Sequence, residues 1–370
     1  MINLLYVFSN LSIGGAEQHL LTILRNIDPS LYKPIVCCIR EKGRIGEEIE
    51  ELGFSLVCLE RKSKSIDLRI LLDLLHLIDT RNIHIVHTHL YQACMYGRIA
   101  ALIRGLPSVV TEHTAHKKYK LNRRIISRLL ARKTHKVIAV SQTVKEYVIE
   151  RDGIESSRIE VMHNGIDVPR YSSRLTKAEA REILRIPADG FLVGTVGRVE
   201  EQKGQMYLIN AVRIVKESIP SLRALVVGSG SCEDSLKKTV SNLGLDRHVF
   251  FMGPRRDVPE ILRALDVFAL PSLREGLPLA LLEAMASSLP VIVTPVGGIP
   301  EIVTNELNGL IVPPRDERSL AESIIALFHD NELRKKLGQT AMTTIQEKFS
   351  AQNMVSHLEH VYGSLLEGAA

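Results

Sequence analysis

Two acidic residues, Glu275 and Glu283, lie eight positions apart around a predicted strand-to-helix junction. Val267–Leu270 has the pattern of a buried strand, a glycine-containing loop follows, and a helix is predicted to begin near Leu279 with Pro278 at its first position. Free N–H groups and the positive dipole end of a helix favour an anion. Carboxylates beside that anion would accept from hydroxyl groups, so the stretch predicts a site for a sugar-bearing phosphate such as a nucleotide sugar. The alternative is that both glutamates only favour the helix dipole.

Two further loops could bind a phosphate. Arg198 and Lys203 follow the predicted strand Phe191–Val196. A guanidinium donates paired hydrogen bonds to phosphate and an ammonium adds a compact charge, so the two could neutralise a departing diphosphate. A solvated loop with two surface cations is the alternative. Near the N-terminus, Gly14 and Gly15 precede a predicted helix, where the backbone could approach a ligand or simply form a flexible turn.

Histidines gather near two predicted strand ends in the first half of the chain. A spacing of two places His87 and His89 on one face of a strand, and His113 follows the next strand. Metal ligation is one interpretation, but no convincing third and fourth ligands accompany these residues. Buried or hydrogen-bonded side chains are therefore predicted for His84, His87 and His89, and a cleft position for His113.

The stretch His116–Lys136 contains nine Lys and Arg residues and no acidic residue. On a helical wheel its apolar residues lie on one half and most cations on the other, which is typical of a helix at an anionic lipid surface. A helix docked on its own domain with a solvated basic face is an equal alternative. Few aromatic residues lie among the cations, so nucleic-acid binding is disfavoured. The residues assigned to the membrane or acceptor side are Lys117, Lys118, Arg123, Arg124 and Arg128.

The whole chain has the composition of a globular protein. Its 370 residues are 45% hydrophobic and 24% charged, and the length suffices for two domains. No apolar run approaches the roughly 20 residues of a membrane span. The N-terminus predicts a first strand and not a signal peptide. The five cysteines lack CxxC spacing, which predicts reduced buried thiols and no zinc site.

Short apolar runs alternate with amphipathic segments through both halves of the chain. This alternation predicts an α/β protein with two doubly wound, Rossmann-like parallel sheets. The pattern breaks between Ile166 and Leu175, so the predicted domains are residues 1–170 and 171–350, with a helix in 351–370 that could pack back on the first domain. Ligands bind at the carboxyl ends of such strands, so two facing domains would share one cleft. The predicted strands of the first half are Asn3–Phe8, Lys33–Ile39, Ser55–Leu59, Ile83–His87, Ser108–Thr111, Lys136–Val140 and Glu160–Met162.

These motifs, in this order, give the chain a specific resemblance along nearly its full length. It resembles the family 4 glycosyltransferases of the GT-B fold. The resemblance implies a retaining enzyme that moves a hexose-type sugar from a UDP- or GDP-sugar to a hydroxyl of a glycan or lipid-linked acceptor, in polysaccharide or lipopolysaccharide synthesis. It implies no metal or other cofactor and a peripheral place on the inner face of the cytoplasmic membrane. The motifs are Gly14–Glu17, Glu112-His113, Asn164–Asp167, Gly197-Arg198, Lys203-Gly204, Glu275–Glu283, Pro290–Thr294 and Gly297–Glu301.

The resemblance also implies roles for single residues. Arg198 and Lys203 would hold the donor diphosphate, Glu275 and His113 would contact the transferred sugar, and Glu283 would accept from the ribose hydroxyls. The implied catalytic residues are Glu275, His113, Arg198 and Lys203. The implied donor-binding residues are Gly15, Arg198, Lys203, Gly228, Glu275, Gly276, Leu277 and Glu283, with Gly15 close to the donor phosphates or the acceptor.

A glutamate at the ribose is a poor partner for a covalent double displacement, which uses two close carboxylates. A front-face transfer is therefore predicted, in which the leaving diphosphate helps to deprotonate the incoming hydroxyl. Two other functions stay open at this point. One is a nucleotide-sugar 2-epimerase of the same architecture, and the other is a non-catalytic protein that binds nucleotide sugars.

Overall fold

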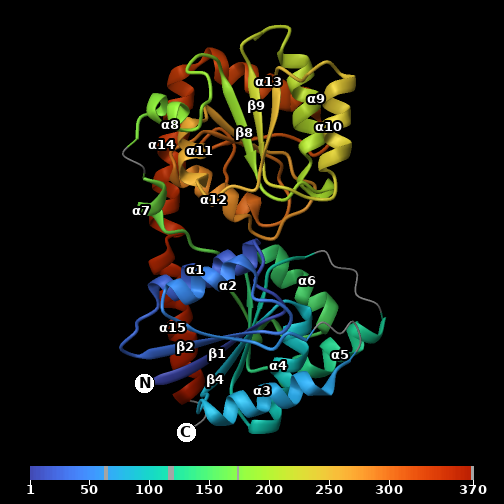
Figure 1. The fold of residues 1–370 in the computed structure, drawn as a ribbon, viewed down its shortest axis with the longest axis vertical. Coiled ribbons are helices and arrows are strands. Elements are labelled where there is room, and N and C mark those ends of the chain that lie inside the picture. The colour runs from blue at the N-terminus through green and yellow to red at the C-terminus, as the bar shows by residue number, and fades with distance from the viewer. Residues whose placement is uncertain (62–65, 116–120, 173–174, 368–370) are drawn as a thin grey trace. The chain divides into compact units, whose positions relative to one another are not determined.

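The computed structural model describes residues 1–61, 66–115, 121–172 and 175–367, except the side chain of Asn122. The chain forms two compact units (Figure 1). Met1–Gly165 and Ala351–Ala370 make up the first unit, and Ile166–Ser350 makes up the second. Both units are α/β, so the predicted fold class is confirmed.

The first unit is built on a parallel sheet in the order β3-β2-β1-β4-β5-β6-β7. The chain reverses its direction of strand addition between β1 and β4, the position where ligands of doubly wound sheets bind. The strands are β1 (Ile2–Phe8), β2 (Tyr32–Cys38), β3 (Ser55–Cys58), β4 (Ile85–His89), β5 (Ser108–Glu112), β6 (Lys136–Ala139) and β7 (Ile159–Val161).

Helices cover both faces of this sheet (Figure 1). Alternate residues of β1 point to opposite faces: Leu4 packs with α1, α2 and α15, whereas Leu5 packs with α3 and α4. The C-terminal helix therefore packs on the first unit, as the sequence predicts. The helices are α1 (Gly15–Asn26), α2 (Gly43–Glu51), α3 (Leu68–Thr80), α4 (Tyr91–Arg104), α5 (Leu121–Ala131), α6 (Gln142–Asp152), the 3-10 helix η1 (Ser156–Arg158) and α15 (Ala351–Glu367).

The second unit repeats the plan with a parallel sheet in the order β10-β9-β8-β11-β12-β13. The strands are β8 (Leu192–Val196), β9 (Arg223–Val227), β10 (Val249–Gly253), β11 (Val267–Leu270), β12 (Val291–Val293) and β13 (Leu310–Ile311). The helices are α7 (Val168–Tyr171), α8 (Lys177–Ile183), α9 (Gln205–Val215), α10 (Glu233–Asn242), α11 (Val258–Ala264), α12 (Leu279–Ala286), α13 (Glu317–His329) and α14 (Asn331–Lys348), and the 3-10 helices are η2 (Glu201–Lys203) and η3 (Ile299–Glu301).

Two local predictions need correction. The strand predicted at Ile83–His87 begins and ends two residues later, at Ile85–His89, because the segment before it is a turn in which His84 is exposed. Pro278 is the N-cap of α12 and has extended backbone angles, so it precedes the first helical residue. Within the described ranges, no helix is both long and apolar enough to cross a membrane.

Candidate active site

The loop between β11 and α12 holds Glu275 in an ion pair. Nζ of Lys203 lies 2.7 Å and 3.0 Å from the two carboxylate oxygens of Glu275. Oγ of the buried Ser272 donates to the same carboxylate at 2.7 Å. The Lys203 and Glu275 side chains are 15% and 8% exposed, so solvent screens the pair only weakly. The structure thus brings together two of the four residues predicted to be catalytic.

Close backbone contacts fix the two loops that carry this pair. The N–H group of Leu273 donates to the carbonyl of Gln202 at 2.7 Å, which joins the β11–α12 loop to the loop after β8. Gly297 has a φ of +60°, and a Cβ there would lie 2.2 Å from the carbonyl oxygen of Glu275. The N–H group of Gly298 donates to the carbonyl of Gly276 at 2.7 Å. The backbone around Glu275 therefore has little freedom to move.

The other predicted donor-binding residues of this unit have different settings. Arg198 is exposed, and its carbonyl accepts from Nε2 of Gln205 at 2.9 Å. Leu277 is buried. The N–H group of Gly228 donates to the carbonyl of Gly253 at 2.8 Å, and a Cβ on Gly228 would lie 1.9 Å from the carbonyl oxygen of Gly197. A packing requirement therefore already explains the glycine at position 228.

Glu283 lies on α12 and is half-buried. The hydroxyl of Tyr171 donates to its Oε1 at 2.8 Å. Burial raises the pKa of the Glu283 carboxyl, and the hydrogen bond from Tyr171 opposes this rise. Tyr171 belongs to the segment that looks like a linker in the sequence, so the structure gives that segment a direct contact with a predicted site residue.

In the first unit, imidazole rings stack at the carboxyl ends of β4 and β5. The ring centroids of His87 and His89 lie 4.4 Å apart, and the ring of His89 also stacks on Phe8 at 4.4 Å. Nδ1 of His89 and Nε2 of His113 are 3.0 Å apart. The ring of His19, from α1, meets His113 edge-on at 5.2 Å. His113 is half-buried, whereas the other three histidines are fully buried.

Burial keeps these imidazoles neutral. It is the main cause that lowers the pKa of His19, His87 and His89 well below the ordinary value, and their mutual repulsion adds to the effect. Burial, followed by the neighbouring His87, lowers the pKa of His113 to about 3. Among the described residues, no group of three or more His, Cys, Asp or Glu side chains is arranged to hold a metal ion.

Comparison with known proteins agrees with this geometry. The family described as Glycosyltransferase Family 4 matches residues 13–170, and that described as Glycosyl transferases group 1 matches residues 176–344. UDP-Gal:alpha-D-GlcNAc-diphosphoundecaprenol alpha-1,3-galactosyltransferase of Escherichia coli is 31% identical over 309 residues, which are 80% of this chain and 79% of the relative. The chain belongs to the family 4 glycosyltransferases.

Two other similar proteins extend this comparison. The lipopolysaccharide core biosynthesis mannosyltransferase LpsB of Rhizobium meliloti is 29% identical to this glycosyltransferase over 247 residues, 65% of this chain and 68% of the relative. The crystal structure of Anabaena HepE in complex with UDP-glucose superposes with a TM-score of 0.87, covers 98% of this chain and 100% of HepE, and is 23% identical. The fold is therefore GT-B.

The first loop of the glycosyltransferase lies against the side chain of Glu17. A Cβ on Gly14, the N-cap of α1, would lie 2.4 Å from Oε2 of Glu17, so this carboxylate sits at the N-terminus of its own helix. Gly15 has open space where a Cβ would be, so the first unit itself does not require a glycine at that position.

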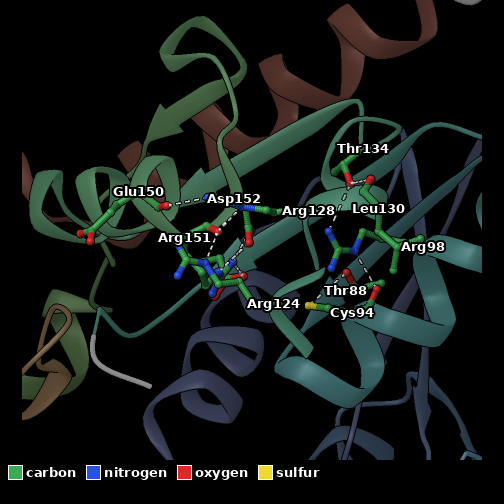
Figure 2. Close-up of polar contacts among 11 residues, drawn as sticks. Thr88, Cys94, Arg98, Arg124, Arg128, Leu130, Thr134, Glu150, Arg151 and Asp152 are labelled. Atoms are coloured by element: carbon green, nitrogen blue, oxygen red, sulfur yellow. Dashed lines mark hydrogen bonds and ion pairs between the residues drawn. The ribbon is translucent and has the colours of Figure 1, made fainter. Parts of the chain in front are cut away.

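The basic helix α5 uses its arginines within the protein (Figure 2). Nε of Arg128 donates to the carbonyl of Arg151 at 2.9 Å, and Nε of Arg124 donates to the same oxygen at 3.4 Å, so both cap the C-terminal end of α6. The guanidinium of Arg123 lies over the ring of Tyr91 at 4.8 Å. All three arginines remain exposed. Lys117 and Lys118 lie outside the described residues.

Apolar side chains of α5 are exposed beside these arginines. Leu121, Ile125 and Leu129 are 74%, 50% and 58% exposed, and they follow one another at intervals of one helical turn. The apolar stripe of the sequence is therefore only partly used for packing inside the first unit. Part of the apolar half of α5 is thus left exposed, and both interpretations of this helix stay predictions.

Sequence reasoning missed several partners of the predicted site residues. Ser272, Tyr171, His89 and Arg151 contact Glu275, Glu283, His113 and Glu112, respectively. Ser272 could have been found, since a hydroxyl three positions before a loop carboxylate is a common local partner. Tyr171 and Arg151 gave no such signal because they are far from their partners along the chain.

Proposed function

We propose that this glycosyltransferase is a retaining enzyme that moves a hexose from a nucleotide sugar to a hydroxyl of a glycan or lipid-linked acceptor. The observation that carries the proposal is the ion pair of Lys203 and Glu275, held by Ser272 at the loop that opens α12. A cation, a fixed carboxylate and a helix N-terminus lie within one small region. This set suits a ligand that combines a phosphate with sugar hydroxyls.

When the donor binds, Lys203 and Glu275 would separate, and each would contact a different part of the nucleotide sugar. The diphosphate would take Lys203 as its partner, together with Arg198 from the same loop, and a hydroxyl of the transferred sugar would donate to Glu275. As the bond to the diphosphate breaks, the two cations and the α12 N-terminus would stabilise the growing negative charge. The contact with Glu275 already holds Nζ of Lys203 at the loop. The lysine side chain would therefore need little rearrangement to reach the diphosphate.

Retention would arise without a covalent sugar intermediate. Glu283 on α12 accepts a hydrogen bond from the hydroxyl of Tyr171 on α7 and is proposed to accept from the ribose hydroxyls. Glu275 is proposed to contact the transferred sugar, so the two carboxylates have separate tasks and do not form a double-displacement pair. The leaving diphosphate would take the proton of the attacking hydroxyl on the same face of the sugar. Cationic side chains carry the charge in this scheme, so we propose that no metal or other cofactor is required.

The relatives favour a UDP-hexose as the donor. The name of the Escherichia coli relative specifies UDP-Gal and a diphosphoundecaprenol-linked acceptor, and HepE was crystallised with UDP-glucose. A UDP-sugar is therefore the first candidate and a GDP-sugar the second. In the first unit, His113 is proposed to contact the transferred sugar. Gly15, which has open space where a Cβ would be, is proposed to approach the donor phosphates or the acceptor.

We place the enzyme peripherally on the inner face of the cytoplasmic membrane. The exposed stripe of Leu121, Ile125 and Leu129 on α5 supports this proposal, since such side chains would enter the boundary between headgroups and acyl chains. Arg123 would add attraction to anionic headgroups. A lipid-linked acceptor would be reached most directly from that position.

A donor and acceptor panel tests the proposed function. The purified protein is incubated with UDP-glucose, UDP-galactose, UDP-N-acetylglucosamine or GDP-mannose, with and without a polyprenyl-diphosphate-linked sugar and with EDTA present. We expect one donor to give an α-linked product only with the acceptor, at a rate that EDTA does not change. An inverted linkage would contradict retention, and an epimerised free nucleotide sugar without acceptor would contradict the transferase assignment.

A further inference from the structure

His113 has a second, fully buried histidine as its hydrogen-bond partner. His89 is the last residue of β4, and His113 directly follows β5, the neighbouring strand, in which Thr111 is the register partner of His89. Nδ1 of His89 lies 3.0 Å from Nε2 of His113, and the two ring planes are inclined by 27°. Nε2 of His113 is thus occupied inside the protein. Only Nδ1 of His113 remains for a ligand.

The other nitrogen of His89 decides where the shared proton lies. Nε2 of His89 is buried and has no hydrogen-bond partner among the described residues. If His113 donated, His89 would carry its proton on Nε2 as a buried N–H group without an acceptor. Buried N–H groups without partners are rarer in proteins than buried acceptors without donors. The favoured arrangement is therefore the reverse, with Nδ1–H of His89 donating to Nε2 of His113.

The backbone holds both histidines in this relation. Leu90, which follows His89 and caps α4, has a φ of 67° and a ψ of 151°, a strained conformation for a branched side chain that persists only where the surroundings impose it. Glu112, which precedes His113, accepts from Nη2 of the buried Arg151 at 2.7 Å. Arg151 is itself fixed by Asp152 (Figure 2).

We propose that His89 is a positioning residue that holds His113 as the neutral Nδ1–H tautomer, so that His113 meets the substrate as a hydrogen-bond donor. The acceptor of that bond would be an oxygen atom of the transferred hexose. In this arrangement His113 does not act as a general base, because its only basic nitrogen is already bound to His89. The inference rests on the proposed function, in which His113 contacts the sugar.

Substitutions at His89 separate the hydrogen bond from simple packing. The amide nitrogen of Asn can stand near the position of Nδ1, whereas that of Gln stands nearer Nε2 and Phe keeps only the stack on Phe8. We expect His89→Asn to retain kcat within about 3-fold, and His89→Gln and His89→Phe to lose about 10- to 100-fold, the usual effect of losing a residue that orients a functional histidine. The KM for the donor should change little in all three variants. The control is His84→Asn, an exposed histidine that accepts from the N–H group of Asn3, which should leave kcat unchanged.

Equal kcat values of His89→Asn and His89→Phe, at matched Tm, would overturn the inference. A second measurement does not depend on a buried variant. In the wild-type protein with 15N-labelled histidine, the signals assigned to His113 through a His113→Asn variant should show a neutral ring protonated at Nδ1 from pH 6 to 8. A ring protonated at Nε2, or an imidazolium, would overturn the inference while leaving the proposed function intact. A His113→Phe variant with the wild-type transfer rate would instead remove His113 from the proposed function.

Discussion

Lys203 and Glu275 neutralise each other in a largely buried setting. Removing either charge leaves the other without its partner, so we expect Lys203→Met and Glu275→Gln each to lower the free energy of unfolding by about 1–3 kcal/mol. Each should also lower kcat about 100- to 1000-fold, the usual effect of losing one electrostatic contact in a transition state. The double variant should recover most of the stability but none of the activity. Urea denaturation and initial transfer rates measure the two effects.

An exposed ion pair provides the control for this prediction. Nζ of Lys237 lies 2.6 Å from Glu233 on α10, one helical turn away. Lys237→Met should leave both kcat and Tm nearly unchanged, because exposed pairs contribute little. A double variant of Lys203 and Glu275 that transferred sugar at the wild-type rate would remove this pair from the proposed mechanism.

Glu283 combines a cost in stability with a proposed role in binding. Burial raises the pKa of its carboxyl, so the charged form is less favourable in the folded than in the unfolded state and lowers stability at pH 7. Glu283→Gln should therefore raise Tm, by a few °C if about 1 kcal/mol is recovered. It should weaken UDP binding, because an amide oxygen accepts more weakly from ribose hydroxyls than a carboxylate does. Thermal unfolding and calorimetric titration with UDP check both results, and a lower Tm with unchanged UDP binding would refute the assignment.

The sequence singles out candidate site residues but not their partners in the fold. Glu275 and Glu283 are recognisable because the strand, loop and helix around them are close in sequence. Lys203 pairs with Glu275 across 72 positions, and Tyr171 binds Glu283 across 112 positions. Such pairs depend on how the loops of one sheet meet, which local patterns do not contain. The proposed roles of all these residues, like those of Arg198, His113 and Gly15, stay predictions.

At the scale of elements, α5 is the segment on which the membrane proposal depends. Three of its apolar side chains are exposed, and Arg124 and Arg128 cap α6, so a charge reversal of these arginines would disturb the fold as well as any lipid contact. Substitution of the exposed apolar residues tests lipid binding with less effect on the fold. Replacing Leu121, Ile125 and Leu129 by Ser should weaken binding to anionic vesicles by about 100-fold, if each side chain contributes about 1 kcal/mol on insertion.

Vesicle co-sedimentation with phosphatidylglycerol and phosphatidylcholine measures this effect. Leu68 and Leu72 on α3 are also exposed, and replacing both by Ser serves as the control for apolar surface in general. We expect the control variant to bind as the wild type does. Equal loss in the two variants, or no loss in either, would argue against α5 as the membrane-facing element.

Strand positions were predicted well because parallel strands are continuous apolar runs buried on both faces. The error at β4 has a physical origin. The apolar residues Ile83, Ile85 and Val86 favour a strand that begins at Ile83 and ends at His87. The buried strand instead begins at Ile85 and extends through the polar His89. The imidazoles are accepted there because they stack on each other and on Phe8. Because β4 extends to His89, the ring of His89 lies at the strand end, next to His113.

At the scale of the molecule, the chain returns to its first unit through α15. Tyr362 on that helix donates to or accepts from Tyr6 at 2.8 Å, and its hydroxyl lies 2.6 Å from Nδ1 of His87. Oγ1 of Thr111 lies 2.7 Å from Nε2 of the same ring. The C-terminal helix thus completes a buried polar network that begins in β1, which ties the last segment of the chain to the histidine cluster.

The histidine cluster should make the first unit sensitive to mild acid. In the folded state the pKa of each of His19, His87, His89 and His113 is lowered from about 6.5, so the unfolded chain binds more protons as the pH falls below that value. Stability is therefore full above pH 6.5 and declines as the pH falls, by at most about 1.4 kcal/mol per pH unit for each histidine. For His113 the decline continues to a pH of about 3.

Urea denaturation at intervals between pH 7.5 and 5 measures this decline. Circular dichroism is the suitable signal, because the chain contains no tryptophan. His113→Asn should make the free energy of unfolding fall less steeply with pH, by the contribution of one histidine. This variant removes the half-buried member of the cluster, so it loses the least packing. His360→Ala, which alters an exposed histidine of α15, should keep the wild-type slope. A free energy of unfolding that stayed constant from pH 7.5 to 5 would mean that the four rings are not held neutral by the fold, and the hydrogen bond from His89 to His113 would then lose its physical basis.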